Sequence, residues 1–244
     1  EERRWIAAVI GFNFPTDEGV HLLFEDATPP PDGVVGLVLF VDMSHSMNDH
    51  VRELKTILAA WLAKSNAEGL KLPKLEGCTG MVHAVQKHAH LLSTHDVVVL
   101  TDGYENQFKG TLTVGRNDDG SPMNVNMEEC VNHSQGFKGE YLINVASYLM
   151  HVCGAQLYFV GLGADAEQMA QHMIKRRNCH VAVVRKGANI AEIHGTVRQL
   201  RGNAALTLKE PEREPQQDVI KVQLSAEAIA QLDAMAVAEI RQME

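Results

Sequence analysis

The fold is decided by residues 34–46, which read VVGLVLFVDMSHS. The first eight residues form a continuous apolar run, without the alternation of polar and apolar positions that marks a strand with one face in water. Continuous runs of this kind are typical of strands that are buried on both faces, as in a parallel sheet covered by helices. The stretch therefore predicts a central strand that is followed at once by a polar turn.

Three later segments repeat the buried-strand pattern, at residues 97–100, 156–162 and 180–184. Helical spacing of apolar residues marks the segments between or after them, which are 51–61, 81–92, 142–152, 166–176 and 190–200. Because buried strands alternate with helices over residues 34–203, the sequence predicts the α/β class. The expected architecture is a doubly wound, mostly parallel open sheet of the Rossmann-like kind.

Residues 1–33 precede this alternation. They contain two segments compatible with strands, at 5–14 and 20–24, followed by a connector with three consecutive prolines. Three prolines in a row fit neither a helix nor a central strand, so the connector is expected to be stiff. The two segments together are compatible with a hairpin.

Two polar regions complete the predicted domain organisation. Residues 107–138 form an insertion, in which segments 111–114 and 123–125 flank an Asp-Asp-Gly turn and predict a small hairpin. Residues 204–244 contain a charged linker and then the patterns of a strand and an amphipathic helix. We expect this strand–helix extension to dock onto the body of the protein or onto a partner.

Composition and charge exclude several classes of protein. The 244 residues contain 22 Lys and Arg against 31 Asp and Glu, which gives a net charge of −9. Nucleic acid is therefore not expected as the main partner, because binding phosphates needs a basic field. The sequence has no apolar run of 18 residues, so we expect no transmembrane helix. Its four cysteines include no Cys-x-x-Cys pair and predict free thiols in a reducing compartment, hence a cytoplasmic protein.

Asp42, Ser44 and Ser46 form the spacing Asp-x-Ser-x-Ser directly after the first buried strand. In a doubly wound sheet, ligands bind at the edge where the strands have their carboxyl ends. One carboxylate and two hydroxyls on a single turn suit a hard cation such as Mg²⁺, which prefers oxygen ligands. The alternative is that the two serines only cap the following helix, and that the later dipeptide Asp102-Gly103 forms only a turn.

Two further segments bring oxygen donors toward the same edge. Residues 101–103, Thr-Asp-Gly, end the second buried strand, so Asp102 lies beside Asp42 if the two strands are neighbours. Residues 77–80, Gly-Cys-Thr-Gly, precede the helix that leads into that strand and present the Thr79 hydroxyl on a loop. The sequence therefore predicts a divalent-cation site formed by five side chains, Asp42, Ser44, Ser46, Thr79 and Asp102.

The order of a buried strand, the Asp-x-Ser-x-Ser turn, a helix, the threonine loop and a second strand that ends in Thr-Asp-Gly resembles a von Willebrand factor type A (VWA) domain. In such domains these segments form a metal-ion-dependent adhesion site (MIDAS). Members of that family carry Asp-x-Ser-x-Ser after a strand, a threonine on a later loop, and an aspartate in Thr/Ser-Asp-Gly at the end of another strand. All five positions are matched here, and the resemblance covers residues 34–203. It implies Mg²⁺ or Mn²⁺ as the bound ion, with the hydroxyls as direct ligands and the two carboxylates holding it directly or through water.

The resemblance implies a function in binding rather than in catalysis. The cation would accept an Asp or Glu carboxylate from another protein, so we expect an intracellular, metal-dependent protein–protein interaction module. Similar proteins work with an AAA+ ATPase or another component of a multi-subunit assembly, and the insertion is expected to shape the choice of partner. Two alternatives are a Ro-like component of a ribonucleoprotein, which residues 101–106 (TDGYEN) resemble, and a metal-dependent hydrolase, which would need an activated water.

The chain departs from the family pattern at two points. His45 stands between the two serines, where the family often has glycine, and a loop histidine that faces solvent is the simplest interpretation. The span from Ser46 to Thr79 is short, with room for one helix and at most a short strand at 70–72. Either one edge of the sheet is missing, or the two N-terminal segments fill it. The second of these is our hypothesis.

Overall fold

The computed structural model describes residues 5–13, 20–103, 108, 110–127, 140–164, 166–174, 176 and 178–207. The chain divides into two compact units, Glu1–Ala205 and Leu206–Glu244. The strand and helix expected at 219–224 and 226–243 lie outside the described residues, as do residues 128–139 of the insertion.

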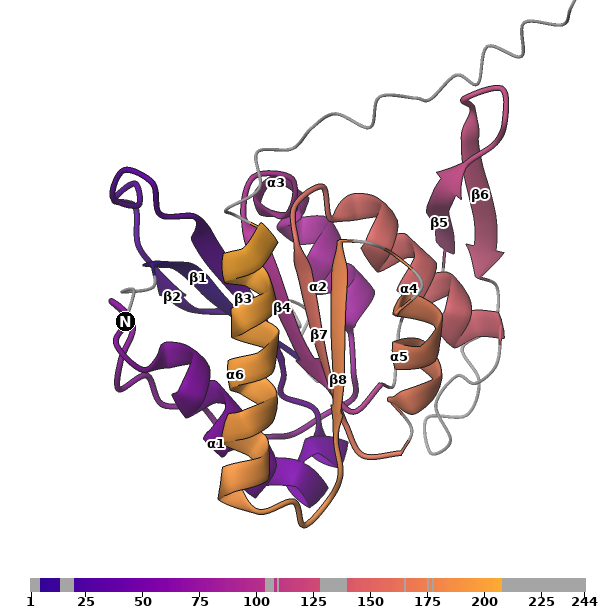
Figure 1. The fold of residues 1–244 in the computed structure, drawn as a ribbon. Helices are drawn as coiled ribbons and strands as arrows, with labels where there is room; N and C mark the ends of the chain where they lie inside the picture. The colour runs from indigo at the N-terminus through magenta and orange to yellow at the C-terminus, as the bar shows by residue number, and fades with distance from the viewer. Residues whose placement is uncertain are drawn as a thin grey trace, which may run out of the picture. The chain divides into compact units, whose positions relative to one another are not determined.

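Six strands in the described part of the chain form one mixed sheet (Figure 1). They are β1 (Trp5–Phe12), β2 (Val20–Glu25), β3 (Gly36–Asp42), β4 (Asp96–Thr101), β7 (Leu157–Leu162) and β8 (Cys179–Val184). The order across the sheet is β2-β1-β3-β4-β7-β8. β2 runs antiparallel to β1, and every other neighbouring pair is parallel. A mostly parallel sheet whose strands are joined by helices confirms the predicted α/β class.

Helices cover both faces of the sheet. A short 3₁₀-helix, η1 (His45–His50), leads into α1 (Val51–Leu62), which packs with α6 (Ile190–Thr207) against one face. The other face carries α2 (Met81–Lys87), α3 (Ala89–Leu92), α4 (Glu140–Val152) and α5 (Glu167–Met173). In Figure 1, α6 crosses in front of the sheet, while α2 and α4 lie behind it. None of the described helices is long and apolar enough to cross a membrane.

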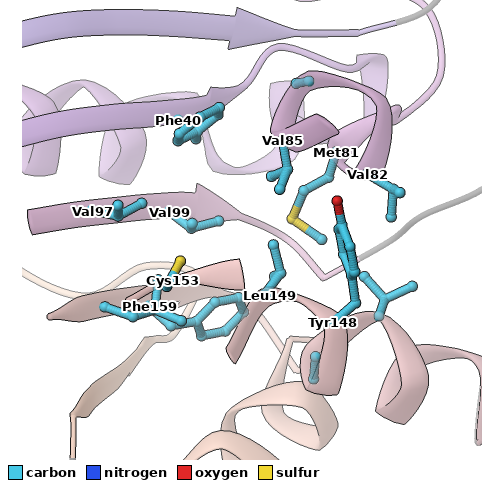
Figure 2. Packing of buried hydrophobic residues seen from close by; sticks show 14 of the residues in the cluster. Phe40, Met81, Val82, Val85, Val97, Val99, Tyr148, Leu149, Cys153 and Phe159 are labelled. Carbon is cyan, nitrogen blue, oxygen red and sulfur yellow. The ribbon is translucent and has the colours of Figure 1, made fainter. Parts of the chain in front are cut away.

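The central strand β3 shows why its sequence is apolar throughout. Successive side chains of a strand point to opposite faces of the sheet, so Val38 and Phe40 enter one core and Leu39 and Val41 the other. All four side chains are completely buried. Figure 2 shows the first of these cores, in which side chains from β3, β4 and β7 meet side chains from α2 and α4.

Leu39 is expected to contribute strongly to stability because it is completely buried on β3. The change Leu39→Ala is expected to lower the free energy of unfolding by about 2–5 kcal/mol, through lost apolar burial and the cavity left behind. Leu22→Ala is the matched control, since Leu22 also lies on a strand but is 51% exposed. Changes at exposed positions usually stay within about 0.5 kcal/mol. Urea unfolding measures both variants, and equal losses would contradict this assignment of the core.

The N-terminal strands form one edge of the sheet. β1 lies between β2 and β3, and its parallel pairing with β3 runs from Trp5 opposite Gly36 to Phe12 opposite Asp42. This arrangement confirms the hypothesis that the N-terminal segments fill the edge of the sheet. β1 and β2 therefore belong to the same sheet as the strands that follow residue 34.

Two segments differ from the sequence prediction. Residues 70–72 form no strand, and Leu70 and Leu72 instead pack against the core that α1 and α6 cover. An alternation of only three residues is also satisfied by an irregular loop that turns two apolar side chains inward. The helix expected at 81–92 is interrupted at His88, which separates α2 from α3.

The hairpin expected in the insertion is present. β5 (Gly110–Arg116) and β6 (Pro122–Met127) pair antiparallel as a separate two-stranded sheet. Leu112 and Met127 are buried, and β5 packs against α4. An isolated two-stranded hairpin is marginally stable in water at best, so this contact with α4 supports its folding.

Candidate metal centre

The carboxyl ends of β3 and β4 bring Asp42 and Asp102 to the same edge of the sheet. Asp42 is the last residue of β3, and Asp102 follows the last residue of β4. The two strands are parallel neighbours, with Val41 opposite Leu100. Asp42 therefore stands beside Thr101, and Asp102 is the next residue along the chain. The predicted site required these two strands to be neighbours, and they are.

Asp42 is a completely buried carboxylate, and both of its oxygens accept hydrogen bonds. Its Oδ1 accepts from the backbone N–H of Ser44 at 2.9 Å, and its Oδ2 accepts from the hydroxyl of Thr101 at 2.7 Å. The Thr101 oxygen in turn accepts from the N–H of Gly103 at 3.1 Å, which fixes the hydroxyl in place. The orientation of the Asp42 carboxylate is therefore set by groups from both strand ends.

The pKa of Asp42 is raised well above the ordinary value of an aspartate. Burial is the larger cause because it disfavours the charged form, and the neighbouring charge of Asp102 adds to it. Hydrogen bonds from Ser44 and Thr101 lower the pKa but do not offset these two effects. Asp102 is itself only 2% exposed. Two carboxylates thus share a site that water hardly reaches, and ionised groups in such places are normally paired or bound to a metal.

Ser44 and Ser46 lie on the turn that follows Asp42. Ser44 is buried, Ser46 is half-buried, and their hydroxyl oxygens are 3.0 Å apart. Ser44 precedes η1, but its side chain makes no capping hydrogen bond to that helix. The alternative role of Ser44 as a side-chain helix cap is therefore not what the structure shows.

Thr79 is brought to the same turn by its loop. The N–H of Glu76 donates to the carbonyl oxygen of Met43 at 2.9 Å, and the N–H of His45 donates to the carbonyl oxygen of Gly77 at 2.8 Å. These two bonds run in opposite directions and hold the loop against the Asp-x-Ser-x-Ser turn. Thr79 is buried and stands two residues before the start of α2.

The five predicted residues thus lie at one edge of the sheet, and every side-chain atom that they could offer to a metal is an oxygen. Two carboxylates and three hydroxyls suit Mg²⁺ and Mn²⁺, which favour oxygen ligands. Among residues whose structure is described, no three His, Cys, Asp or Glu side chains form a group that could hold a metal. A metal site at this edge would therefore depend on the hydroxyls as well as on the carboxylates. His45 is exposed, as expected for a loop histidine.

Sequence reasoning missed three polar residues at this edge. Asn13 is buried after β1 and donates to the carbonyl oxygen of Glu76 at 2.8 Å. Asn48 donates to the carbonyl oxygen of Leu75 at 3.0 Å. Thr101 donates its hydroxyl hydrogen bond to the carboxylate of Asp42. Thr101 belongs to the recognised Thr-Asp-Gly segment, whereas no sequence signal distinguishes the two asparagines from others in loops.

A serine–histidine contact lies elsewhere, between α4 and α5. The hydroxyl oxygen of Ser147 and Nε2 of His172 are 2.9 Å apart. Ser147 lies in the middle of α4, rather than on the sharp turn that exposes a nucleophilic serine in hydrolases. This contact joins two helices, and it does not bear on the metal-dependent hydrolase alternative, which needs an activated water at a metal. Residues 104–106, on which the Ro-like alternative partly depends, lie outside the described residues.

The described cysteines are free thiols, as the sequence predicts. Cys153 and Cys179 are buried, and Cys78 is half-buried. Burial raises the pKa of both buried thiols to about 12, which keeps them protonated and unreactive at neutral pH. The fourth cysteine, Cys130, lies outside the described residues.

No family model matches the chain, and comparisons with the curated proteins and with the solved structures found no match. The resemblance to VWA domains therefore depends on the five matched residues and on their places in the fold.

Proposed function

We propose that this protein is a metal-dependent protein–protein interaction module with a VWA fold and a MIDAS-type site. One observation carries the proposal: the buried carboxylates of Asp42 and Asp102 stand together beside hydroxyl groups, and the charge of Asp102 disfavours the charged form of Asp42. Buried charges are normally paired or bound to metals. A divalent cation would neutralise the two carboxylates and find further ligands in the hydroxyls.

Mg²⁺ or Mn²⁺ is the ion we propose, because both favour oxygen ligands. The hydroxyls of Ser44, Ser46 and Thr79 would coordinate it directly. Asp42 and Asp102 would hold it directly or through water. Hydroxyls are neutral ligands. Where the two carboxylates hold the ion through water, its direct ligands from this chain are uncharged, so the ion would attract an Asp or Glu carboxylate from a partner protein.

The proposed partner is a component of a larger assembly, and the resemblance to VWA proteins makes an AAA+ ATPase one candidate. The net charge of −9 argues against direct binding of nucleic acid. The β5–β6 hairpin follows Asp102 in the chain, and we propose that this insertion contributes to partner choice, as loops beside binding sites often do. The free thiols favour a cytoplasmic location.

The change Ser44→Ala is expected to weaken Mg²⁺ binding at least about tenfold, because it removes one hydroxyl ligand without changing the charge. Ser65→Ala is the matched control, since Ser65 is also a buried serine, with a hydroxyl that accepts the N–H of Ala67 at 3.1 Å. Calorimetric titration with Mg²⁺ compares both variants with the wild type. An unchanged affinity in Ser44→Ala would contradict the proposed ligand role.

Binding of an acidic partner is tested with peptides that contain Asp or Glu and with the same peptides carrying Asn or Gln. The acidic peptides should be retained in the presence of Mg²⁺ and released by a chelator, and the amide versions should not be retained. A wild-type protein that binds neither Mg²⁺ nor Mn²⁺ would show the proposed function to be wrong. Hydrolytic turnover that disappears in a folded Asp42→Ala variant would favour the hydrolase alternative instead.

A further inference from the structure

The loop that carries Thr79, residues 63–80, contains no helix and only isolated bridge residues. Its position therefore depends on individual hydrogen bonds. Besides the two backbone bonds that join it to the Asp-x-Ser-x-Ser turn, two asparagine side chains hold the part of the loop nearest to Thr79. Asn48 donates to the carbonyl oxygen of Leu75 at 3.0 Å, and Asn13 donates to that of Glu76 at 2.8 Å.

Asn13 is the more informative of the two asparagines, because it belongs to the N-terminal strands and lies far from this loop in the sequence. It follows β1 and is 3% exposed. Its Oδ1 accepts from Nε2 of His21 on β2 at 2.7 Å, while its Nδ2 donates to the carbonyl oxygen of Glu76. Both ends of the amide are thus engaged, so the side chain is fixed in one orientation.

These bonds close a ring that joins three chain segments. The carbonyl of Glu76 is held by Asn13, and the N–H of Glu76 is bonded to the carbonyl of Met43. The N–H of Met43 is in turn bonded at 2.9 Å to the carbonyl of Phe12, the residue before Asn13. The ring therefore ties together the end of β1, the end of β3 and the loop that carries Thr79.

We propose that Asn13 is a positioning residue of the cation site, which sets the place of the Thr79 loop relative to Asp42. The proposal rests on the proposed function, because it presupposes a cation at this edge of the sheet. Asn13 acts through the backbone of Glu76 and does not touch the ion. The hairpin of β1 and β2 is then part of the binding apparatus as well as an edge of the sheet.

Asn66 provides a matched control at the opposite end of β1. Its Oδ1 accepts from the N–H of Ile6, and its Nδ2 donates to the carbonyl of Ile6, both at 2.8 Å. Like Asn13, it uses a side-chain amide to join β1 to the segment that follows α1. Asn66 lies at the start of the same loop, but its bonds are at the amino end of β1, away from the edge that carries the site. The change Asn66→Ala therefore removes an anchoring amide without disturbing the part of the loop next to Thr79.

The test compares the full-length wild type with Asn13→Ala and Asn66→Ala. Calorimetric titration measures the Mg²⁺ affinity of each protein, and thermal unfolding measures its Tm. Both variants are expected to lower Tm. Only Asn13→Ala is expected to weaken Mg²⁺ binding, by about 10–100-fold, as for other residues that orient metal ligands. Equal affinity in Asn13→Ala and the wild type, or an equal loss in Asn66→Ala, would overturn the positioning role.

His21 supplies a second test should Asn13→Ala fold poorly. His21→Leu removes the donor that fixes Asn13 and is expected to weaken Mg²⁺ binding in the same direction. His21→Gln keeps an amide donor and is expected to restore the affinity, and a failure to do so would overturn the proposal. A wild type without affinity for Mg²⁺ would overturn the proposed function as well, whereas a binding wild type with unaffected variants would overturn only the positioning role.

Discussion

Replacing Asp102 with alanine is expected to abolish Mg²⁺ binding while the protein remains folded. The change removes one of the two carboxylates that attract the cation, so the affinity should fall more than about 100-fold, beyond the usual effect of losing an outer-shell partner. The fold should survive, because Asp102 lies after the end of β4 and outside both hydrophobic cores. Removing its charge also relieves the repulsion that raises the pKa of Asp42.

Asp96→Ala is the control for this variant. Asp96 begins β4, the strand that Asp102 follows, and so occupies the opposite end of the same element. Calorimetric titration with Mg²⁺ and Mn²⁺ should show wild-type affinity for Asp96→Ala and no binding for Asp102→Ala. Circular dichroism and thermal unfolding check that both variants are folded. Unchanged affinity in a folded Asp102→Ala variant would refute the proposed site.

The contribution of Asp42 to the stability of the metal-free protein is expected to fall as the pH rises, and Mg²⁺ is expected to compensate for this loss. The pKa of Asp42 is higher in the folded than in the unfolded protein, because of burial and the charge of Asp102. Protonation of this carboxyl therefore stabilises the folded state, fully below the unfolded pKa of about 3.9. The contribution is lost as the pH rises through the raised pKa. Excess Mg²⁺ binds the ionised site of the folded state and stabilises it by mass action.

Asp42→Asn isolates this contribution, because it removes the titrating charge and keeps the size of the side chain. Without metal, the free energy of unfolding of the variant relative to the wild type should increase as the pH rises from about 4 to 8. The variant should also lose the response to Mg²⁺. Asp49→Asn is the control: Asp49 is exposed, and its ion pair with Lys186 lowers the pKa of Asp49. It should keep the wild-type response to Mg²⁺. A constant difference between Asp42→Asn and the wild type over this pH range would contradict the prediction.

The centre of the sheet and the main turn of the site could be predicted because both are local in the sequence. An eight-residue apolar run forces a strand covered on both faces, and the Asp-x-Ser-x-Ser spacing follows it directly. The position of Asp102 beside Asp42 also followed from one assumption about strand order. Each of these inferences needs only one strand or one pair of adjacent parallel strands.

The contacts that hold the site together could not be predicted, because they join segments that are distant in the sequence. Nothing in the residues around Asn13 indicates that its amide reaches Glu76, since asparagine after a strand is common in ordinary turns. The segment at 70–72 shows the opposite error. Its Leu-Lys-Leu alternation suggested a strand, but the loop places both leucines against a core without pairing.

The position of β1 has a practical consequence for work with shortened versions of this protein. A fragment that began after the proline-rich connector would leave one whole side of β3 without its neighbouring strand. The backbone groups uncovered in this way are a template for pairing with other polypeptides, and such edges promote aggregation. Any fragment cut for crystallisation or interaction screens should therefore begin upstream of Trp5.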